Sequence, residues 1–166
     1  MSLEQLNAAN QDTARALLQQ CCSSDAWVER LLAARPFNSP EELGAAADSA
    51  WQDLAAPDYL QAFAGHPKIG DVNSLNARYS HSKRLAAGEQ LSVAHASDAV
   101  IAALAQANTR YEDRFGFIFI VCATGKSAQQ MLDLLLARLP NRRDEELVTA
   151  AEEQRKIFQL RLEKLL

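Results

Sequence analysis

Signals for helix starts, each followed by apolar residues at helical spacing, recur along this chain and constrain its fold more than any other feature. Ser39 can cap free backbone N–H groups, Pro40 fits the first helical position, and Glu42 completes a capping box. Ser127 and Gln130 repeat the box ahead of a leucine-rich stretch. The sequence therefore predicts an all-α fold, a single-domain helical bundle.

The same patterns predict where the helices lie. We expect them over residues 11–20, 25–34, 40–55 and 57–64, across the region from Val100 to Phe115, and after Ser127. The last segment reads as one long amphipathic helix, because six residues recur at helical spacing: Leu147, Ala151, Gln154, Phe158, Arg161 and Leu165. The large aromatic residues Trp27, Trp51 and Phe158 fall on apolar stripes, so we expect them in the core.

Two stretches depart from the helical pattern. Residues 65–92 mix Gly, Pro, Asn and Ser with isolated charges, and Phe115–Cys122 is rich in the β-branched and aromatic residues that favour strands. A single strand would leave its backbone groups unpaired. We therefore expect a short, buried extended segment around residues 115–124, in which Phe117 and Phe119 could serve either the core or a ligand.

Size and charge limit the classes of protein. A chain of 166 residues with 48% hydrophobic residues fits one domain over residues 1–166, and a net charge of −4 argues against nucleic acid as a partner. Arg138, Arg142 and Arg143 are followed at once by acidic residues, which predicts a solvated helix junction. The sequence has no run of apolar residues able to span a membrane and no secretory signal. Its three cysteines suit a reducing compartment, so we expect a cytoplasmic protein.

His66 is the histidine with the most distinctive surroundings. It lies in Gly65-His66-Pro67-Lys68-Ile69-Gly70, where the proline disfavours helix at the preceding residue and so predicts a defined turn. An imidazole titrates near neutrality and can donate or accept a proton there. A loop histidine is also commonly an ordinary surface residue, so the residues alone leave both readings open.

No metal, nucleotide or nucleophile motif accompanies this histidine. The three histidines match no zinc spacing, and the chain has neither GxGxxG nor GxSxG. The stretch Gly88-Glu89-Gln90 places a carboxylate beside an amide. These two side chains could bind a polar ring, or they could be exposed polar residues at a helix end.

Several motifs together, in order along the chain, resemble the family of 2-oxo-4-hydroxy-4-carboxy-5-ureidoimidazoline (OHCU) decarboxylases. They are Arg35-Pro36-Phe37, Gly65–Gly70, Gly88–Gln90, Tyr111–Ser127 and Leu160-Arg161-Leu162. The resemblance covers nearly the whole chain. It implies a helical bundle without a cofactor that releases CO2 from OHCU and protonates the resulting carbon on one face to give (S)-allantoin, in urate degradation.

The resemblance also implies roles for particular residues. His66 would be the catalytic acid, with Glu89 beside it as a second catalytic residue. The substrate would be bound by side-chain or backbone groups of Pro67, Ala86, Ala87, Gly88, Glu89, Gln90, Val121, Cys122, Ala123, Thr124 and Gly125. The implied partner is the small-molecule substrate, with no nucleic acid, membrane or metal, and a homodimer is left open.

Two positions depart from the family pattern. Ala86 stands where some members have a serine that contacts the substrate, and Thr124 stands where some have an arginine. The substrate carboxylate would then need another cation, and Lys68, Lys126, Arg114 and Arg161 are the candidates.

The implied chemistry is compatible with the absence of a cofactor motif. The conjugated C=N and C=O groups of the substrate ring can accept the electron pair left by CO2, a task that many decarboxylases assign to a cofactor. Two alternatives remain from the residues alone. One is a non-enzymatic adaptor that docks through its last helix, and the other is a metal-dependent amidohydrolase that uses His66, His81 and Glu89.

Overall fold

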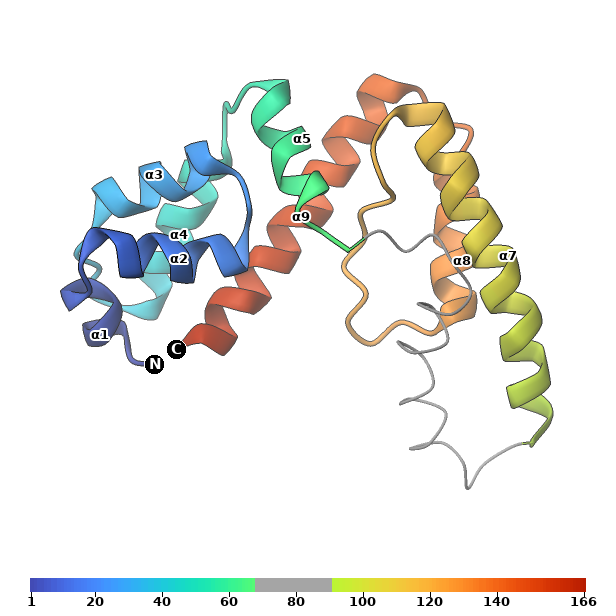
Figure 1. Ribbon diagram of the computed structural model, residues 1–166, viewed down its shortest axis with the longest axis horizontal. Helices are drawn as coiled ribbons and strands as arrows, with labels where there is room; N and C mark the ends of the chain where they lie inside the picture. Colours follow the sequence, from blue (N-terminus) through green and yellow to red (C-terminus); the bar gives the residue numbers. More distant parts are fainter. Residues whose placement is uncertain (68–90) are drawn as a thin grey trace. The chain divides into compact units, whose positions relative to one another are not determined.

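The computed structural model describes residues 1–67 and 91–166, with only the backbone described for 91–97. Within these ranges the chain has eight helices and no strand (Figure 1), which confirms the all-α fold. The helices are α1 (Leu3–Ala8), α2 (Gln11–Cys21), α3 (Asp25–Ala34), α4 (Pro40–Trp51), α5 (Ala56–Ala64), α7 (Leu91–Phe115), α8 (Ala128–Arg138) and α9 (Arg143–Leu165).

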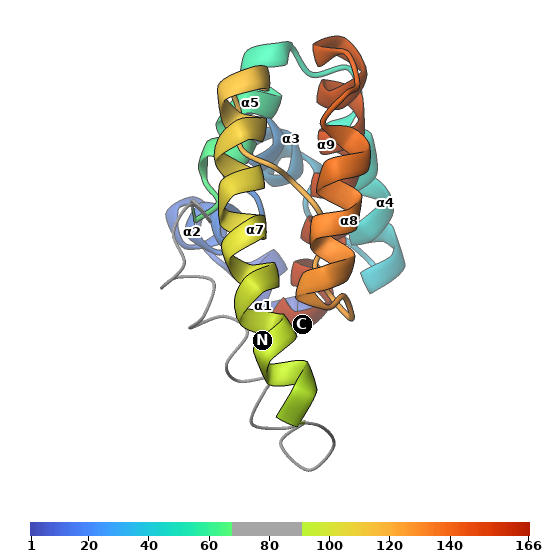
Figure 2. The same ribbon diagram turned by 90° about the vertical axis from the view of Figure 1, so that its right-hand side faces the viewer.

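The chain packs as two compact units. Unit 1 comprises Met1–His66 and Thr149–Leu166, and unit 2 comprises Pro67–Val148. Helix α9 contributes residues to both units. In unit 2, α7 and α8 lie side by side (Figure 2). That residues 1–166 act as one domain stays a prediction.

Side-chain caps define several helix starts, as the sequence predicts. The backbone N–H of Glu42 donates to Ser39 Oγ at 3.1 Å, and Ser127 and Gln130 bond reciprocally at 3.2 and 2.9 Å. The carboxylate of Glu42, however, accepts from the N–H of Asn38 at 2.7 Å rather than from Ser39. A cap of this kind is worth about 1 kcal/mol, because it satisfies a backbone donor that has no partner within the helix.

Two expected boundaries and one missed helix need correction. Helix α4 ends at Trp51 instead of residue 55, and the chain turns through Asp53, which has a φ of 57°. Helix α7 begins at Leu91 instead of Val100, so it includes Leu91 and Ser92, which were expected outside the helices. Helix α1 was not predicted, although Ser2 and Gln5 form a capping box at its start.

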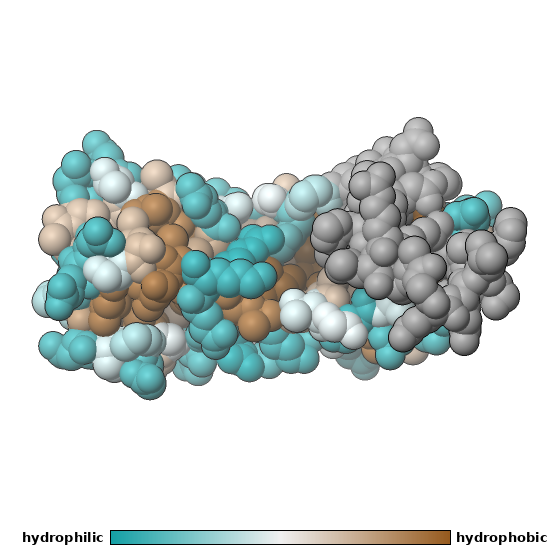
Figure 3. All heavy atoms as spheres, turned by 90° about the horizontal axis from the view of Figure 1, so that it is seen from below, coloured by the Kyte–Doolittle hydropathy of each residue, from teal (hydrophilic) through white to brown (hydrophobic). Residues whose placement is uncertain are grey.

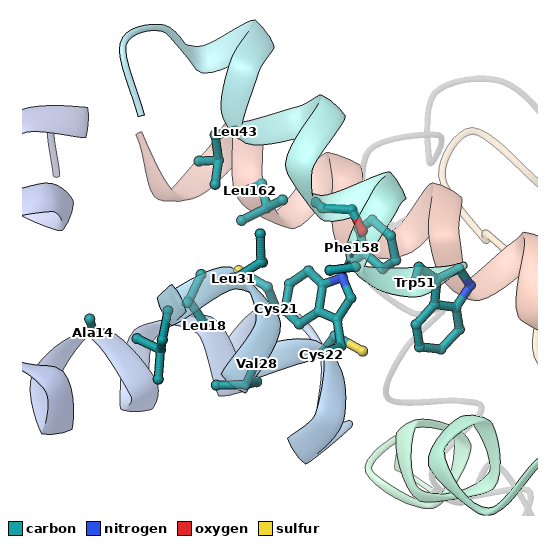
Figure 4. Close-up of a cluster of buried hydrophobic side chains, with 14 of the residues drawn as sticks. Ala14, Leu18, Cys21, Cys22, Val28, Leu31, Leu43, Trp51, Phe158 and Leu162 are labelled. Atoms are coloured by element: carbon teal, nitrogen blue, oxygen red, sulfur yellow. Dashed lines mark hydrogen bonds between the residues drawn. The ribbon is translucent and has the colours of Figure 1, made fainter. Parts of the chain in front are cut away.

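The core of unit 1 is built mainly from α2, α3, α4 and α9 (Figure 4), with Leu6 of α1 and Ala62 of α5 completing it. Trp27 and Phe158 are fully buried with their ring centres 4.9 Å apart, and Trp51 is 5% exposed. The indole N–H groups of Trp27 and Trp51 donate to the carbonyl oxygens of Ala47 and Ala151, each at 3.0 Å. The core role predicted for these three aromatic residues is confirmed.

The Arg35-Pro36-Phe37 motif connects α1 to the rest of unit 1 by hydrogen bonds. Arg35 donates to the carbonyl oxygens of Leu6 and Ala9, both at 2.9 Å. Asn7 and the backbone of Phe37 exchange two further hydrogen bonds, and the Phe37 side chain is buried. This motif therefore has a structural role in the described part of the chain.

Helix α9 buries every fourth residue along one face. The five residues are Glu146, Ala150, Gln154, Phe158 and Leu162. The predicted face is confirmed for Gln154 and Phe158, and Ala151 and Leu165 are partly buried against the core. Leu147 and Arg161 are only partly buried. Two of the five buried residues are polar, and a buried polar side chain needs a partner to offset its desolvation.

The extended segment between α7 and α8 confirms the predicted break in the helical pattern. Residues 118–123 have neither helix nor strand, and Phe119, Ile120 and Cys122 are buried. Phe115 is the last residue of α7, and Gly116, with a φ of 78°, turns the chain out of the helix. A positive φ of this size favours glycine.

Exposed large apolar side chains are few in the described residues. They are Met1, Leu134, Leu136 and Val148. Polar residues cover much of the face drawn in Figure 3, with apolar surface between them. No helix among the described residues is long and apolar enough to cross a membrane.

The buried thiols Cys21 and Cys22 predict a pH dependence of stability. Burial raises the pKa of Cys21 to about 11 and that of Cys22 to about 12, whereas an unfolded thiol ionises near pH 8.5. The stability that comes from burying the neutral thiols is therefore complete below about pH 8.5 and is lost as the pH rises toward the folded values.

We expect the free energy of unfolding in urea to fall more steeply above this pH in the wild type than in Cys22→Ala. The extra slope should approach about 1 kcal/mol per pH unit. Tyrosine and lysine ionisation is common to both proteins and cancels in the comparison. Equal slopes would contradict the burial of a neutral Cys22 thiol.

Candidate active site

His66 follows the end of α5 directly. Its backbone N–H donates to the carbonyl oxygen of Phe63 at 3.2 Å, and the side chain of Phe63 is fully buried. Gly65 caps the helix, and Pro67, which is exposed, follows the histidine. The chain therefore leaves α5 at a fixed point, with the half-buried His66 side chain at the turn predicted from Pro67.

Gly65 leaves no room for a larger residue. A Cβ at this position would come within 2.1 Å of Ser23 Oγ and 2.5 Å of Ser23 Cβ. Its φ of −74° suits any residue, so the restriction is steric. The close approach of Ser23 thus fixes the backbone immediately before His66.

We expect Gly65→Ala to displace the backbone at His66. Overpacking of this kind typically costs about 1–3 kcal/mol of stability. Ser23→Gly in the same chain removes both clashing atoms and should restore the stability. Urea unfolding of the single and double variants tests this, and a double variant no more stable than Gly65→Ala would contradict the steric explanation.

The His66 ring contacts α9 within unit 1. Its Nε2 is hydrogen-bonded to Oε1 of Gln154, which is fully buried. The two residues are 88 positions apart in the sequence. Gln154 was predicted only as part of an apolar face, so its contact with the histidine is new.

A buried polar cluster lies in unit 2, where the sequence predicted a solvated junction. Glu146 is fully buried, and its Oε1 accepts from Arg138 Nε at 2.7 Å and from the Tyr111 hydroxyl at 2.5 Å. Asn141 Nδ2 donates to Glu146 Oε2 at 3.1 Å. Burial, and then the hydrogen bond to Glu146, raise the pKa of Tyr111. The prediction was wrong for Arg138 and Glu146, although Arg142 does lie exposed beside Asp144.

This cluster supports the extended segment. Arg138 Nη1 donates to the carbonyl oxygen of Ile120 at 2.7 Å, and its guanidinium lies 4.7 Å from the centre of the Phe119 ring. The Phe119 and Phe117 rings pack edge-on against Tyr111. The two phenylalanines, left open by the sequence, are therefore core residues of unit 2.

The backbone of Val121–Gly125 continues from this supported part of the chain. Cys122 is buried, whereas Thr124 and Gly125 are exposed at a turn that the Lys126 N–H closes on the carbonyl oxygen of Ala123 at 3.1 Å. Lys126 Nζ also donates to the carbonyl oxygen of Cys122 at 2.7 Å. The segment predicted to bind the substrate ring thus ends in a well-defined turn.

The four candidate cations have different surroundings. Arg114 donates to the carbonyl oxygens of Pro140 and Asn141, and Arg161 donates to that of Cys21. Lys126 lies in the turn just described, and Lys68 lies outside the described residues.

The remaining predicted site residues also lie outside the described residues. They are Ala86, Ala87, Gly88, Glu89 and Gln90, and the same holds for His81. Of the other predicted residues, His66 belongs to unit 1, and Pro67 and Val121–Gly125 belong to unit 2. Within the described part of the chain, no three His, Cys, Asp or Glu side chains are grouped as a metal site would require.

Comparison with known proteins decides the family. The family model described as OHCU decarboxylase matches residues 7–163. The chain belongs to the OHCU decarboxylase family. As the resemblance implied, it is a decarboxylase, and the comparisons support decarboxylation of OHCU in urate degradation.

Individual relatives agree with this family. The "Uric acid degradation bifunctional protein TTL" of Arabidopsis thaliana is 35% identical over 87% of the chain, which spans 45% of that longer protein. A "2-oxo-4-hydroxy-4-carboxy-5-ureidoimidazoline decarboxylase" of Haloferax volcanii is 25% identical over 98% of the chain and 94% of its own length.

A solved structure supports the fold as well. The "Crystal structure of OHCU decarboxylase in the presence of (S)-allantoin" is 31% identical to this OHCU decarboxylase family member. It matches with a TM-score of 0.71 over 95% of this chain and 98% of that one.

Proposed function

We propose that this chain converts OHCU to (S)-allantoin and CO2, with His66 as the general acid that protonates the substrate carbon. One observation carries the assignment to His66. Its imidazole is half-buried and hydrogen-bonded to the fully buried Gln154, an arrangement that orients a ring more firmly than a position on open surface. An oriented acid of this kind typically contributes about 100- to 10,000-fold to the rate.

In the proposed reaction, the bond from the ring carbon to the carboxylate breaks, and its electron pair moves into the conjugated C=N and C=O groups of the substrate. The adjacent ring carbon, which bears the ureido group, then takes a proton from His66, forming the new C–H bond on one face. The hydroxyl on the carbon that lost CO2 gives its proton to the ring nitrogen that received the electron pair and becomes a carbonyl. The protein must orient the ring, stabilise the developing negative charge and deliver one proton. These tasks fit hydrogen-bond donors and an acid held in fixed positions.

We assign the other tasks to the residues that the family pattern indicates. Glu89 would keep His66 protonated, and Glu89 and Gln90 would orient the ureido and ring groups. Pro67 and residues 86–88 would line the substrate. Backbone groups of Val121–Gly125 would bind the ring, which agrees with their place in a segment outside helix hydrogen bonding.

Release of CO2 tests the reaction and its main chemical rival together. OHCU is generated from urate with a urate oxidase and the following hydrolase, and CO2 is measured with and without this protein after exhaustive chelation. We expect the chelated protein to accelerate CO2 release as much as the untreated protein does. Loss of activity on chelation, with recovery on adding Zn2+, would favour the metal-dependent amidohydrolase that uses His66, His81 and Glu89.

Two further expectations remain proposals. The three cysteines are free thiols and all are buried, which agrees with the reducing cytoplasm as the location. A homodimer stays a prediction.

A further inference from the structure

Gln154 is a buried polar residue of α9 in unit 1. It occupies the same face as Ala150, Phe158 and Leu162, and its side chain is fully buried. Its amide Nε2 has no hydrogen-bond partner, a statement that holds for the part of the chain that the structure describes. Leaving a buried donor unpaired costs free energy. If this position served packing alone, leucine would serve it better, as it does at residue 162.

The one hydrogen bond described for the Gln154 side chain goes to His66. The amide oxygen can only accept, so the imidazole Nε2 must carry the hydrogen. The hydrogen bond at one ring nitrogen determines the role of the other. Neutral His66 is therefore the Nε2–H tautomer, and Nδ1 is the nitrogen that gains and loses a proton.

We propose that Gln154 is a positioning residue for His66. It holds Nε2–H so that Nδ1 delivers the proton to the substrate carbon. The imidazolium gives its Nδ1 proton to the carbon and becomes the neutral Nε2–H tautomer, which keeps its hydrogen bond to Gln154. A proton from the bulk solvent then returns to Nδ1, and it is the one proton that the overall reaction consumes. This inference rests on the proposed function of His66.

The chemical nature of the partner supports this role. An amide oxygen is a neutral acceptor, so Gln154 orients the ring without adding to the stabilisation of the imidazolium that is assigned to Glu89. A second carboxylate in place of Gln154 would stabilise the imidazolium further and oppose release of the proton. The backbone of His66 is held by the Phe63 carbonyl and its ring by Gln154, so both ends of the residue are oriented.

A matched pair of variants on α9 tests the proposal. Gln154→Leu keeps the size of the side chain and removes the acceptor. Gln159→Leu is the control, because Gln159 also lies on α9 in unit 1. The substitution removes two hydrogen bonds, to the carbonyl oxygen of Gly44 and to Asp48, and neither involves the histidine. Gln154→Met is the alternative should the leucine variant fail to fold.

Proton NMR of the free protein reads out the hydrogen bond without any substrate. We expect a downfield, slowly exchanging Nε2–H signal that is present in the wild type and in Gln159→Leu. The signal should be absent from Gln154→Leu. It should also be absent from His66→Asn, and this second loss assigns the signal to His66. A wild type without this signal, or a signal that persists in Gln154→Leu, would overturn the inference whatever the activity.

Kinetics test the consequence for catalysis. We expect Gln154→Leu to lower kcat by about 10- to 100-fold with little change in KM, because orientation of the acid matters most in the transition state. In a His66→Asn background the same substitution should have no further effect. An unchanged kcat in Gln154→Leu would overturn the positioning role alone, whereas a wild type inactive on OHCU would overturn both this inference and the proposed function.

Discussion

Replacement of His66 by asparagine is expected to lower kcat for OHCU by about 100- to 10,000-fold while the protein stays folded. Asparagine keeps a polar side chain at the turn after α5 but cannot donate a proton at neutral pH. The substitution leaves the buried Gln154 amide without this hydrogen bond, which should cost about 1–3 kcal/mol of stability. Helical circular dichroism and urea unfolding check the fold, and the initial rate of OHCU loss gives kcat.

His81→Asn is the matched control for this variant. The metal-dependent alternative requires both histidines, so it predicts that either substitution abolishes activity. The general-acid proposal predicts a large loss for His66→Asn alone. A folded His66→Asn protein with near-normal turnover would refute the assignment.

The second large effect concerns the buried cluster of unit 2. Arg138→Leu leaves the fully buried carboxylate of Glu146 without its guanidinium partner. Removing one member of a buried ion pair typically destabilises a protein by about 3–5 kcal/mol. The substitution also removes the hydrogen bond to the Ile120 carbonyl, so we expect lower turnover in addition to lower stability.

Two comparisons make this prediction specific. Arg142→Leu removes an exposed arginine whose ion pair with Asp144 lies in solvent, and we expect its effect to stay within about 0.5 kcal/mol. Arg138→Leu combined with Glu146→Leu removes both charges and should be less destabilised than Arg138→Leu alone. Urea unfolding measures all three, and equal losses in Arg138→Leu and Arg142→Leu would contradict the buried pair.

Local sequence patterns predicted most of the helices because their signals are local. Ser39 and Ser127 define helix starts through hydrogen bonds that reach only three residues along the chain. The end of α4 was missed because Asp53 adopts a left-handed conformation. Glycine is the usual residue in that conformation, and the sequence has no glycine there to indicate a helix end. The buried face of α9 was predicted only in part because a glutamate is normally exposed to solvent. The burial of Glu146 could not be predicted without knowing its hydrogen-bond partners.

The candidate site was predictable to a different extent. Pro67 placed His66 at a turn, since a proline restricts the residue before it. Nothing local could connect His66 to Gln154, because they are far apart in the sequence and only the folding of unit 1 brings them together. The same holds for Tyr111 and Glu146, whose hydrogen bond joins α7 to α9. Polar residues at helical spacing among apolar ones were the available signal for both Glu146 and Gln154.

The optical activity of the product tests the central claim most directly. OHCU is generated in situ from urate, the protein is added, and circular dichroism is recorded until the reaction is complete. Uncatalysed decay gives racemic allantoin and little final signal. We predict a rapid rise of the (S)-allantoin signal with the wild type and slow decay to a nearly silent product with His66→Asn. A wild type whose progress curve matches the uncatalysed decay would contradict the account.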